Sequence, residues 1–227
     1  MECEAKPHEA LRRSCKRNMY QDGLFITLEG GDGAGKSTLL RRLGERCQQA
    51  GRTPFLTREP GGCALAESVR EVLLKDRQEG MSARAELLLY LAARAQNVEQ
   101  NIAPALAAGN VVLCDRFNDS SIAYQGYGRR LPLEEVHRLC SFATNSLEPR
   151  LTLYLDLPPS EGLARVRKQR AEEGDRLEKQ AIEFHERCRE GFLALAQQHP
   201  QRIVVLDARR TPEALEEQAW TLLHPLL

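Results

Sequence analysis

The chain has 227 residues, enough for one large domain or two small ones with a substantial hydrophobic core. Lysine plus arginine and aspartate plus glutamate both number 32, so the formal net charge is zero. This balance argues against a protein that binds a nucleic-acid polymer by releasing counterions. No stretch approaches the roughly 18 consecutive apolar residues of a membrane span, so no membrane partner is expected.

The seven cysteines are scattered and form no C-x-x-C pair. They predict neither a zinc site nor a disulfide framework, and reduced cysteines in the cytoplasm are the simplest interpretation. Residues 1–22 have mixed charges and lack the apolar core of a secretory signal. We expect a polar, poorly ordered extension there, partly helical around residues 9–17. Residues 23–227 show no internal repeat or long linker, which favours a single domain.

The first predicted strand, residues 24–28, runs into a glycine-rich loop and then a helix that ends near Ala50. Gly30–Ser37 reads G-x-x-x-x-G-K-S between that strand and that helix, which is the pattern of a phosphate-binding loop. Glycines let successive backbone N–H groups turn toward one anion, and the helix N-terminus adds its positive dipole end. The residues expected to bind a nucleoside triphosphate are Gly30, Gly31, Asp32, Gly33, Ala34, Gly35, Lys36, Ser37 and Thr38.

The rest of the chain alternates between strands and helices. In order, the pattern predicts a strand at 53–57, helices at 64–75 and 83–108, a strand at 110–115, a short helix followed by a glycine-bearing turn within 120–128, a helix at 133–144, a strand at 151–157, helices at 161–170 and about 178–198, a strand at 202–207 and a helix at 212–223. This alternation predicts an α/β fold, a five-stranded parallel sheet with helices on both faces, as in P-loop nucleoside triphosphate hydrolases. The helix at 83–108 is apolar nearly all round, so we expect it to be central and buried.

Charged residues follow several predicted strands, at the sheet edge where ligands of such folds gather. Together with Lys36, Arg58 and Arg116 supply more positive charge than one bound nucleotide needs. The excess indicates a second anionic group, held by bidentate hydrogen bonds from the guanidinium groups. Each arginine alone could equally form a salt bridge at a strand end. Their arrival at one edge favours binding of an acceptor phosphate.

Two carboxylates near the loop suggest different tasks. Asp32 would repel a triphosphate, so its side chain should point toward a hydroxyl or amine of the second substrate. Alternatively, Asp32 caps a local turn. Asp115 ends a strand where a carboxylate would meet hydrated Mg²⁺ through water, and the Ser37 hydroxyl would ligate the same ion. Asp156 and Asp207 end similar strands, so the pattern at Asp115 alone is weak.

A basic segment at about residues 165–177 predicts a short lid. It contains Arg165, Arg167, Lys168 and Arg170, with Gly174 as a possible hinge. Such a lid would close arginines over a transferred phosphoryl group and exclude water, although a solvated helix face has the same composition. No catalytic Ser-His-Asp spacing is visible. A phosphate acceptor needs no general base because its second pKa is about 6, so positioning, metal and arginines suffice.

Several motifs in order and spacing resemble those of the thymidylate kinase family, bacterial form, from about Leu24 to the C-terminus. They are Thr-Arg-Glu-Pro-Gly-Gly at 57–62, Leu-Ala-Ala-Arg-Ala-Gln at 91–96, Asp-Arg-Phe at 115–117, Ala-Tyr-Gln-Gly at 123–126 and Asp-Arg-Leu-Glu at 175–178. The resemblance implies transfer of the γ-phosphoryl group of ATP to dTMP with Mg²⁺, giving dTDP for dTTP synthesis. It also implies a homodimer.

The resemblance further implies roles for individual residues. Asp32 would contact the 3′-hydroxyl of the deoxyribose, and Arg58 and Arg116 would bind the dTMP phosphate. Arg94 would hydrogen-bond a thymine carbonyl, and Tyr90, where the family often has Phe, would stack on thymine. The remaining contacts would be Ser120, Ser121 and Gln125 beside the base and Tyr124 against the position of a ribose 2′-hydroxyl. Gly33 stands where some relatives carry an arginine, and in such sequences the lid supplies the catalytic arginines. The catalytic set would then be Lys36, Arg116, Arg165, Arg167 and Arg170.

Two other functions are compatible with a phosphate-binding loop. A kinase for another nucleotide or a deoxynucleoside is disfavoured by the motifs at 57–62 and 123–126. A nucleotide-dependent switch would need a guanine-reading Asn-Lys-x-Asp, which the sequence lacks. A phosphorylation assay across a panel of nucleotides would separate the thymidylate kinase hypothesis from the first alternative, and release of ADP that depends on dTMP would separate it from the second.

Overall fold

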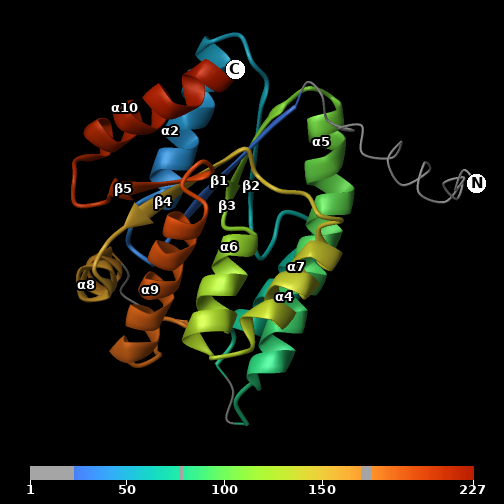
Figure 1. Ribbon diagram of the computed structural model, residues 1–227, viewed down its shortest axis with the longest axis vertical. Coiled ribbons are helices and arrows are strands. Elements are labelled where there is room, and N and C mark those ends of the chain that lie inside the picture. Colours follow the sequence, from blue (N-terminus) through green and yellow to red (C-terminus); the bar gives the residue numbers. More distant parts are fainter. Residues whose placement is uncertain (1–22, 77–78, 170–174) are drawn as a thin grey trace, which may run out of the picture.

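The computed structural model describes residues 23–76, 79–169 and 175–227 (Figure 1). The extension expected at 1–22, the hinge Gly174 and the lid residue Arg170 lie outside the described residues. The predictions for them therefore stay predictions.

Five parallel strands form one sheet in the order β2-β3-β1-β4-β5. Their bounds are β1 Leu24–Gly30, β2 Pro54–Arg58, β3 Val111–Asp115, β4 Leu151–Asp156 and β5 Ile203–Asp207. All seven residues of the central strand β1 are buried, as expected where helices cover both faces of a parallel sheet. The predicted fold class and strand positions are confirmed.

Helices connect the strands along the chain. They are α2 Lys36–Gln49, α3 Ala64–Leu74, α4 Ala83–Asn97, the π-helical turn η1 Val98–Ile102, α5 Ala103–Ala107, α6 Asn118–Ser121, the π-helical turn η2 Ile122–Gly128, α7 Leu133–Ala143, α8 Pro159–Gln169, α9 Ile182–Gln198, α10 Pro212–Leu223 and the 3₁₀ turn η3 His224–Leu226. The helix expected at 83–108 is thus a continuous run of α4, η1 and α5.

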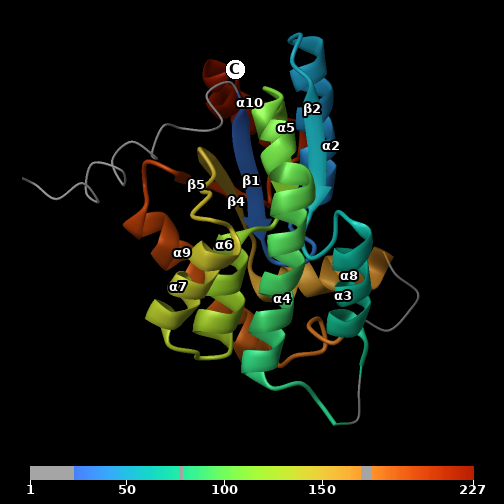
Figure 2. The same ribbon diagram turned by 90° about the vertical axis from the view of Figure 1, so that its right-hand side faces the viewer.

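The sheet lies between two layers of helices (Figures 1 and 2). One face packs against α2 and α10 through residues such as Ile26, Leu43 and Leu215. The other face packs against η1 and α5 near β1 and β3, and against α9 near β4 and β5. Figure 2 shows α5 in front of the strands and α10 behind them. The carboxyl ends of the strands remain free for loops.

One predicted boundary is wrong: α9 begins at Ile182 and not at residue 178. The Asp175 Oδ1 atom accepts hydrogen bonds from the backbone N–H groups of Leu177 and Glu178, at 2.9 and 3.0 Å. The Asp175 side chain thereby takes the place of helical hydrogen-bond acceptors for these two N–H groups, as Asp side chains commonly do in turns. The segment is therefore a compact turn before α9 starts.

Two further sequence observations can be compared with the structure. Within the described residues no helix combines the length and apolar character needed to cross a membrane. Five of the cysteines lie in that part of the chain and are free and buried: Cys47, Cys63, Cys114, Cys140 and Cys188.

Candidate functional site

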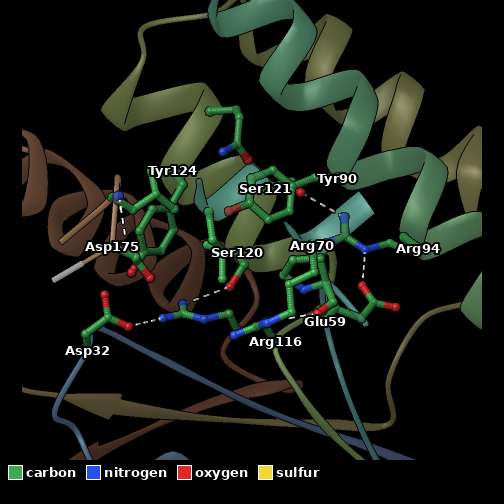
Figure 3. Close-up of a pocket in the computed structure, with 14 residues that line it drawn as sticks. Asp32, Glu59, Arg70, Tyr90, Arg94, Arg116, Ser120, Ser121, Tyr124 and Asp175 are labelled. Atoms are coloured by element: carbon green, nitrogen blue, oxygen red, sulfur yellow. Dashed lines mark hydrogen bonds and ion pairs between the residues drawn. The ribbon is translucent and has the colours of Figure 1, made fainter. Parts of the chain in front are cut away.

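Two adjoining cavities lie beside the carboxyl ends of β1, β2 and β3. The inner pocket has a volume of about 80 Å³ and is lined by Asp32, Glu59, Pro60, Arg70, Leu74, Tyr90, Arg94, Arg116, Ser120, Ser121, Tyr124, Gln125, Asp175 and Leu177 (Figure 3). The outer cleft has a volume of about 380 Å³ and is lined by Asp32, Gly33, Gly35, Lys36, Ser37, Thr38, Arg58, Glu59, Arg70, Asp115, Arg116, Val166 and Glu178. The cavities share Asp32, Glu59, Arg70 and Arg116, so a molecule in one would meet a molecule in the other.

The phosphate-binding loop forms one wall of the outer cleft. Gly33 and Gly35 have φ angles of 75° and 92°, and Gly35 is the N-cap of α2. Only glycine adopts such angles at little cost, which lets the loop expose its N–H groups toward an anion. The ammonium group of Lys36 donates to the Gly31 carbonyl at 2.9 Å. Burial, together with the nearby guanidinium of Arg116, lowers the pKa of Lys36.

The loop also touches the helix that begins the expected lid. A Cβ atom at Gly33 would lie 2.3 Å from the carbonyl oxygen of Gly162 on α8, and a Cβ at Gly162 would lie 2.3 Å from the carbonyl oxygen of Asp32. The two backbones can approach this closely only because both residues lack a side chain. The contact seats α8 directly on the loop.

Ser37 and Asp115 bring two oxygen ligands together in the outer cleft. The Ser37 hydroxyl donates to Asp115 Oδ2 at 2.9 Å, and Asp115 is the last residue of β3. The described residues contain no cluster of three or more His, Cys, Asp or Glu side chains suited to a metal. Mg²⁺ does not need one, because it is commonly bound by one or two protein oxygens plus water and substrate phosphates. The pair therefore fits Mg²⁺.

Arg116 stands between the two cavities. Its Nη2 atom donates to Asp32 Oδ1 at 2.8 Å, and its guanidinium lies 5.0 Å from the ring centre of Tyr124 (Figure 3). The backbone of Arg116 has a φ of 73°, a conformation that a non-glycine residue adopts at some energetic cost. Burial alone would raise the pKa of Asp32, but Arg116 and Lys36 outweigh it and lower that pKa.

Glu29 holds the chain that follows Arg116, and it was not identified from the sequence. This buried carboxyl group on β1 accepts hydrogen bonds from the backbone N–H of Phe117 at 2.7 Å and from the hydroxyl of Ser120 at 2.5 Å. Burial and the charge of Asp119 raise the pKa of Glu29 to about 8. The sequence did contain a signal for Glu29, because a glutamate directly follows the mostly apolar run Leu-Phe-Ile-Thr-Leu in the same strand. A buried polar group of this kind is normally hydrogen-bonded.

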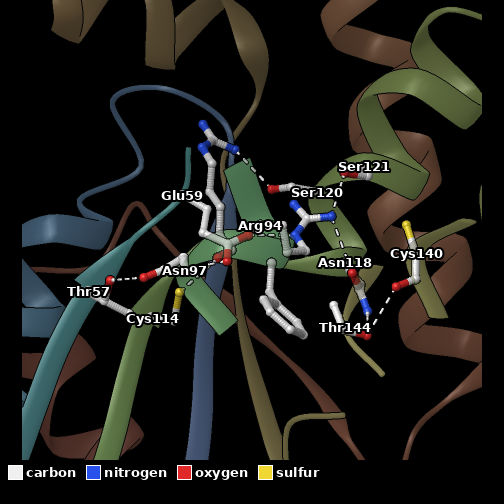
Figure 4. Close-up of polar contacts among 12 residues, drawn as sticks. Thr57, Glu59, Arg94, Asn97, Cys114, Asn118, Ser120, Ser121, Cys140 and Thr144 are labelled. Carbon is white, nitrogen blue, oxygen red and sulfur yellow. Dashed lines mark hydrogen bonds and ion pairs between the residues drawn. The ribbon is translucent and has the colours of Figure 1, made fainter. Parts of the chain in front are cut away.

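Arg94 is held by a dense polar network (Figure 4). Its side chain is 1% exposed, and its Nε atom forms an ion pair with Glu59, whose side chain is 2% exposed. Its Nη1 atom donates to Ser121 Oγ at 2.8 Å and to Asn118 Oδ1 at 3.2 Å. Glu59 also accepts from Asn97 at 3.2 Å. Arg94 is thereby fixed before any ligand binds.

The other substrate residues that the sequence suggests occupy different positions. Tyr90, Tyr124, Ser120, Ser121 and Gln125 line the inner pocket together with Asp32, Arg94 and Arg116. Arg58 lines the outer cleft but not the inner pocket. Its side chain is 56% exposed and is paired with Glu67 at 3.1 Å.

The described lid arginines do not line either cavity. Arg165 donates to the carbonyl oxygens of Ala208 at 3.0 Å and Gly33 at 3.4 Å. Arg167 is exposed on α8. In this structure, therefore, Arg165 supports the phosphate-binding loop from behind.

Several lining residues were given no role from the sequence, among them Arg70, Asp175 and Leu177. Arg70 on α3 lines both cavities, and its Nη1 donates to the Pro60 carbonyl at 2.9 Å. Asp175 and Leu177 close the inner pocket from the turn before α9. An arginine on an amphipathic helix resembles an ordinary surface residue, and the motif at 175–178 carried no position in the site until the fold placed it beside the pocket.

Comparison with known proteins gives consistent results. The family model described as "Thymidylate kinase" matches residues 28–219. A thymidylate kinase of Synechococcus sp. (strain JA-2-3B'a(2-13)) is 52% identical over 204 residues, which is 90% of this chain and 96% of the relative. A thymidylate kinase of Enterococcus faecalis (strain ATCC 700802 / V583) is 46% identical over 199 residues, covering 87% and 94%. The crystal structure of thymidylate kinase from Ehrlichia chaffeensis superimposes with a TM-score of 0.72 at 31% identity, covering 88% of this chain and 98% of that one.

Proposed function

Since the chain belongs to the thymidylate kinase family, which phosphorylates dTMP with ATP to give dTDP, we propose that dTMP occupies the inner pocket and the triphosphate of ATP the outer cleft. The protein is a phosphotransferase whose acceptor is itself a phosphate. The observation that carries the assignment of the two cavities is the position of Arg116. It lines both of them, where the acceptor phosphate must meet the γ-phosphate.

On the ATP side, the loop and Lys36 bind the triphosphate. Backbone N–H groups of residues 30–38 surround the phosphates, and Lys36 exchanges the Gly31 carbonyl for a β- or γ-phosphate oxygen. Mg²⁺, held by Ser37 and through water by Asp115, would neutralise charge on the phosphates when bound. The positive charge of Lys36 and the dipole of α2 favour the triphosphate over a neutral ligand.

On the acceptor side, Arg58 and Arg116 bind the dTMP phosphate. Guanidinium groups suit this task because they donate two parallel hydrogen bonds to phosphate oxygens. Asp32, oriented by its ion pair with Arg116, accepts the 3′-hydroxyl of the deoxyribose. Tyr124 lines the inner pocket in contact with Arg116, and its ring would crowd a ribose 2′-hydroxyl there.

The base lies deepest in the inner pocket. Tyr90 stacks on thymine, and Arg94 donates to a carbonyl oxygen of the ring. Ser121 and Gln125 line the same side, while Ser120 links the base side to Arg116 at 3.4 Å. The polar residues that would read the base, Arg94, Ser121 and Gln125, are buried and hydrogen-bonded to protein partners.

The transfer needs positioning and charge stabilisation, and no side chain has to remove a proton. The acceptor monoester is largely a dianion at neutral pH. Lys36 and Arg116 stabilise charge on the transferred group. Arg165, Arg167 and Arg170 belong to the lid, and they act on the phosphoryl group if α8 and the segment after it close over the cleft.

We also propose that the protein works as a homodimer in the cytoplasm. Exposed apolar side chains on the neighbouring helices α3 and α4, including Leu65, Val72 and Leu88, support a protein–protein interface. The free, buried cysteines are compatible with a reducing compartment. Sedimentation equilibrium would contradict the dimer by finding a monomer at micromolar concentration.

The proposed substrate is tested by measuring ADP release from ATP and Mg²⁺ across a panel of acceptors. We expect dTMP to be used far better than dCMP, dGMP, thymidine or the ribose analogue of dTMP. A preference for another acceptor would contradict the assignment of the inner pocket. ATP hydrolysis that dTMP does not stimulate would instead favour a nucleotide-dependent switch.

A further inference from the structure

A second buried carboxylate, Glu86, lies behind the inner pocket without lining it. It belongs to the first turn of α4 and its side chain is fully buried. Arg129 of η2 donates to both of its oxygens, at 3.1 and 3.0 Å. Arg176, from the turn that closes the pocket, pairs with it at 2.7 Å. Two guanidinium groups therefore keep Glu86 ionised in the interior.

Glu86 has one more partner, and this one belongs to the pocket. Gln125 lines the inner pocket and donates from its Nε2 atom to Glu86 Oε1 at 3.0 Å. An ionised carboxylate can only accept hydrogen bonds, so the amide of Gln125 must present its nitrogen to Glu86. The opposite orientation would place two acceptors against each other. The amide oxygen of Gln125, which makes no hydrogen bond with the described residues, is left for a ligand.

We propose that Glu86 is a positioning residue that fixes the Gln125 amide with its oxygen toward the inner pocket, so that the pocket selects bases with a ring N–H. The proposal rests on dTMP as the occupant of this pocket. Thymine carries an N–H at ring position 3, whereas cytosine carries a lone pair there and an amino group at position 4. An acceptor at Gln125 hydrogen-bonds the thymine N–H and repels the cytosine lone pair.

The sharpest probe is a pair of nucleotides that differ only at this edge. dTMP and 5-methyl-dCMP share the methyl group, sugar and phosphate. We expect the wild-type protein to favour dTMP strongly in kcat/KM and in the Kd measured by calorimetry. In Glu86→Gln, residue 86 can donate as well as accept, so the Gln125 amide is free to turn over. The preference for dTMP should then fall by at least about tenfold, mainly through KM.

Arg129→Gln is the matched control, because it removes two hydrogen bonds to Glu86 but leaves the Gln125 contact in place. It should lower thermal stability much as Glu86→Gln does and leave the preference between the two nucleotides unchanged. An unchanged preference in folded Glu86→Gln would overturn the proposal, and so would an equal loss of preference in Arg129→Gln.

A second variant covers the case in which Glu86→Gln does not fold. Gln125→Met keeps the size of the side chain but removes both the amide oxygen and the amide nitrogen, and it leaves the ion pairs of Glu86 intact. Its preference for dTMP should also fall by at least about tenfold, and a retained preference would overturn the proposal. Failure of the wild-type protein to phosphorylate dTMP is a different result, which would contradict the proposed function itself.

Discussion

The two cavities hold their cationic side chains in different ways. In the inner pocket Arg94 is paired with Glu59, and both side chains are almost completely buried. In the outer cleft Lys36 donates to a backbone carbonyl and Arg58 pairs with Glu67 in contact with solvent. A buried ion pair fixes the position of both partners, whereas a carbonyl or an exposed carboxylate is easily exchanged for a phosphate. Under the proposed assignment, the inner pocket would be organised before its ligand binds, and the outer cleft would complete its contacts on binding the phosphates.

Removing the ammonium group of Lys36 from the outer cleft should give the largest effect on activity. Lys36→Ala is expected to reduce kcat by at least about 1,000-fold, or about 4 kcal/mol, because charge on the transferred phosphoryl group loses its stabilisation. Unfolding by urea should change little, since the Lys36 side chain makes one hydrogen bond to a carbonyl. The exposed Lys75→Ala serves as control. Turnover of Lys36→Ala within tenfold of wild type would contradict its role.

Breaking the buried pair of the inner pocket should act on the fold. Glu59→Gln leaves Arg94 without its counter-charge, and we expect a loss of about 3 kcal/mol in the free energy of unfolding, measured with urea. Glu67→Gln, which removes the exposed partner of Arg58, should cost less than about 1 kcal/mol. Equal losses in the two variants would remove the distinction between the cavities.

The last prediction concerns the pH dependence of stability that the buried Glu29 contributes. Its pKa is raised in the folded protein from 4.5 to about 8, by burial and by Asp119. The folded state therefore holds a proton that the unfolded chain has lost, so this group's contribution to stability falls as pH rises from about 4.5 to about 8. The slope contributed is at most about 1.4 kcal/mol per pH unit.

The comparison variant is Glu29→Gln, which cannot titrate. The difference in unfolding free energy between wild type and Glu29→Gln should shift against the wild type as pH increases through this window. Parallel stability curves for the two proteins would show that Glu29 has an ordinary pKa.

The sequence predicted the fold and the phosphate-binding loop because both depend on local patterns. Alternating strands and helices specify the parallel sheet, and Gly30–Ser37 carries its own geometry in its glycines. The start of α9 was predicted too early because Asp175 forms a turn that helical periodicity does not reveal. The sequence also did not predict contacts between residues far apart in the chain, because no local pattern shows that Glu59 pairs with Arg94 or that Glu86 accepts from Gln125.

The lid arginines show a related gap between composition and position. The cluster of positive charge at 165–170 is evident from the sequence, but Arg165 uses its charge to hold the carbonyls of Gly33 and Ala208. A charged residue on a helix can face a ligand or the protein's own backbone, and the choice is made by tertiary packing.

The contact between Gly33 and Gly162 has an evolutionary consequence. An arginine can reach a transferred phosphoryl group from the loop or from the helix beyond it, but in this chain the first route is sterically closed. Any side chain at Gly33 would collide with the backbone of α8 at Gly162. A side chain could enter the loop at this position only if α8 moved outward at the same time. Positions 33 and 162 are therefore coupled, and a change at one restricts what the other can accept.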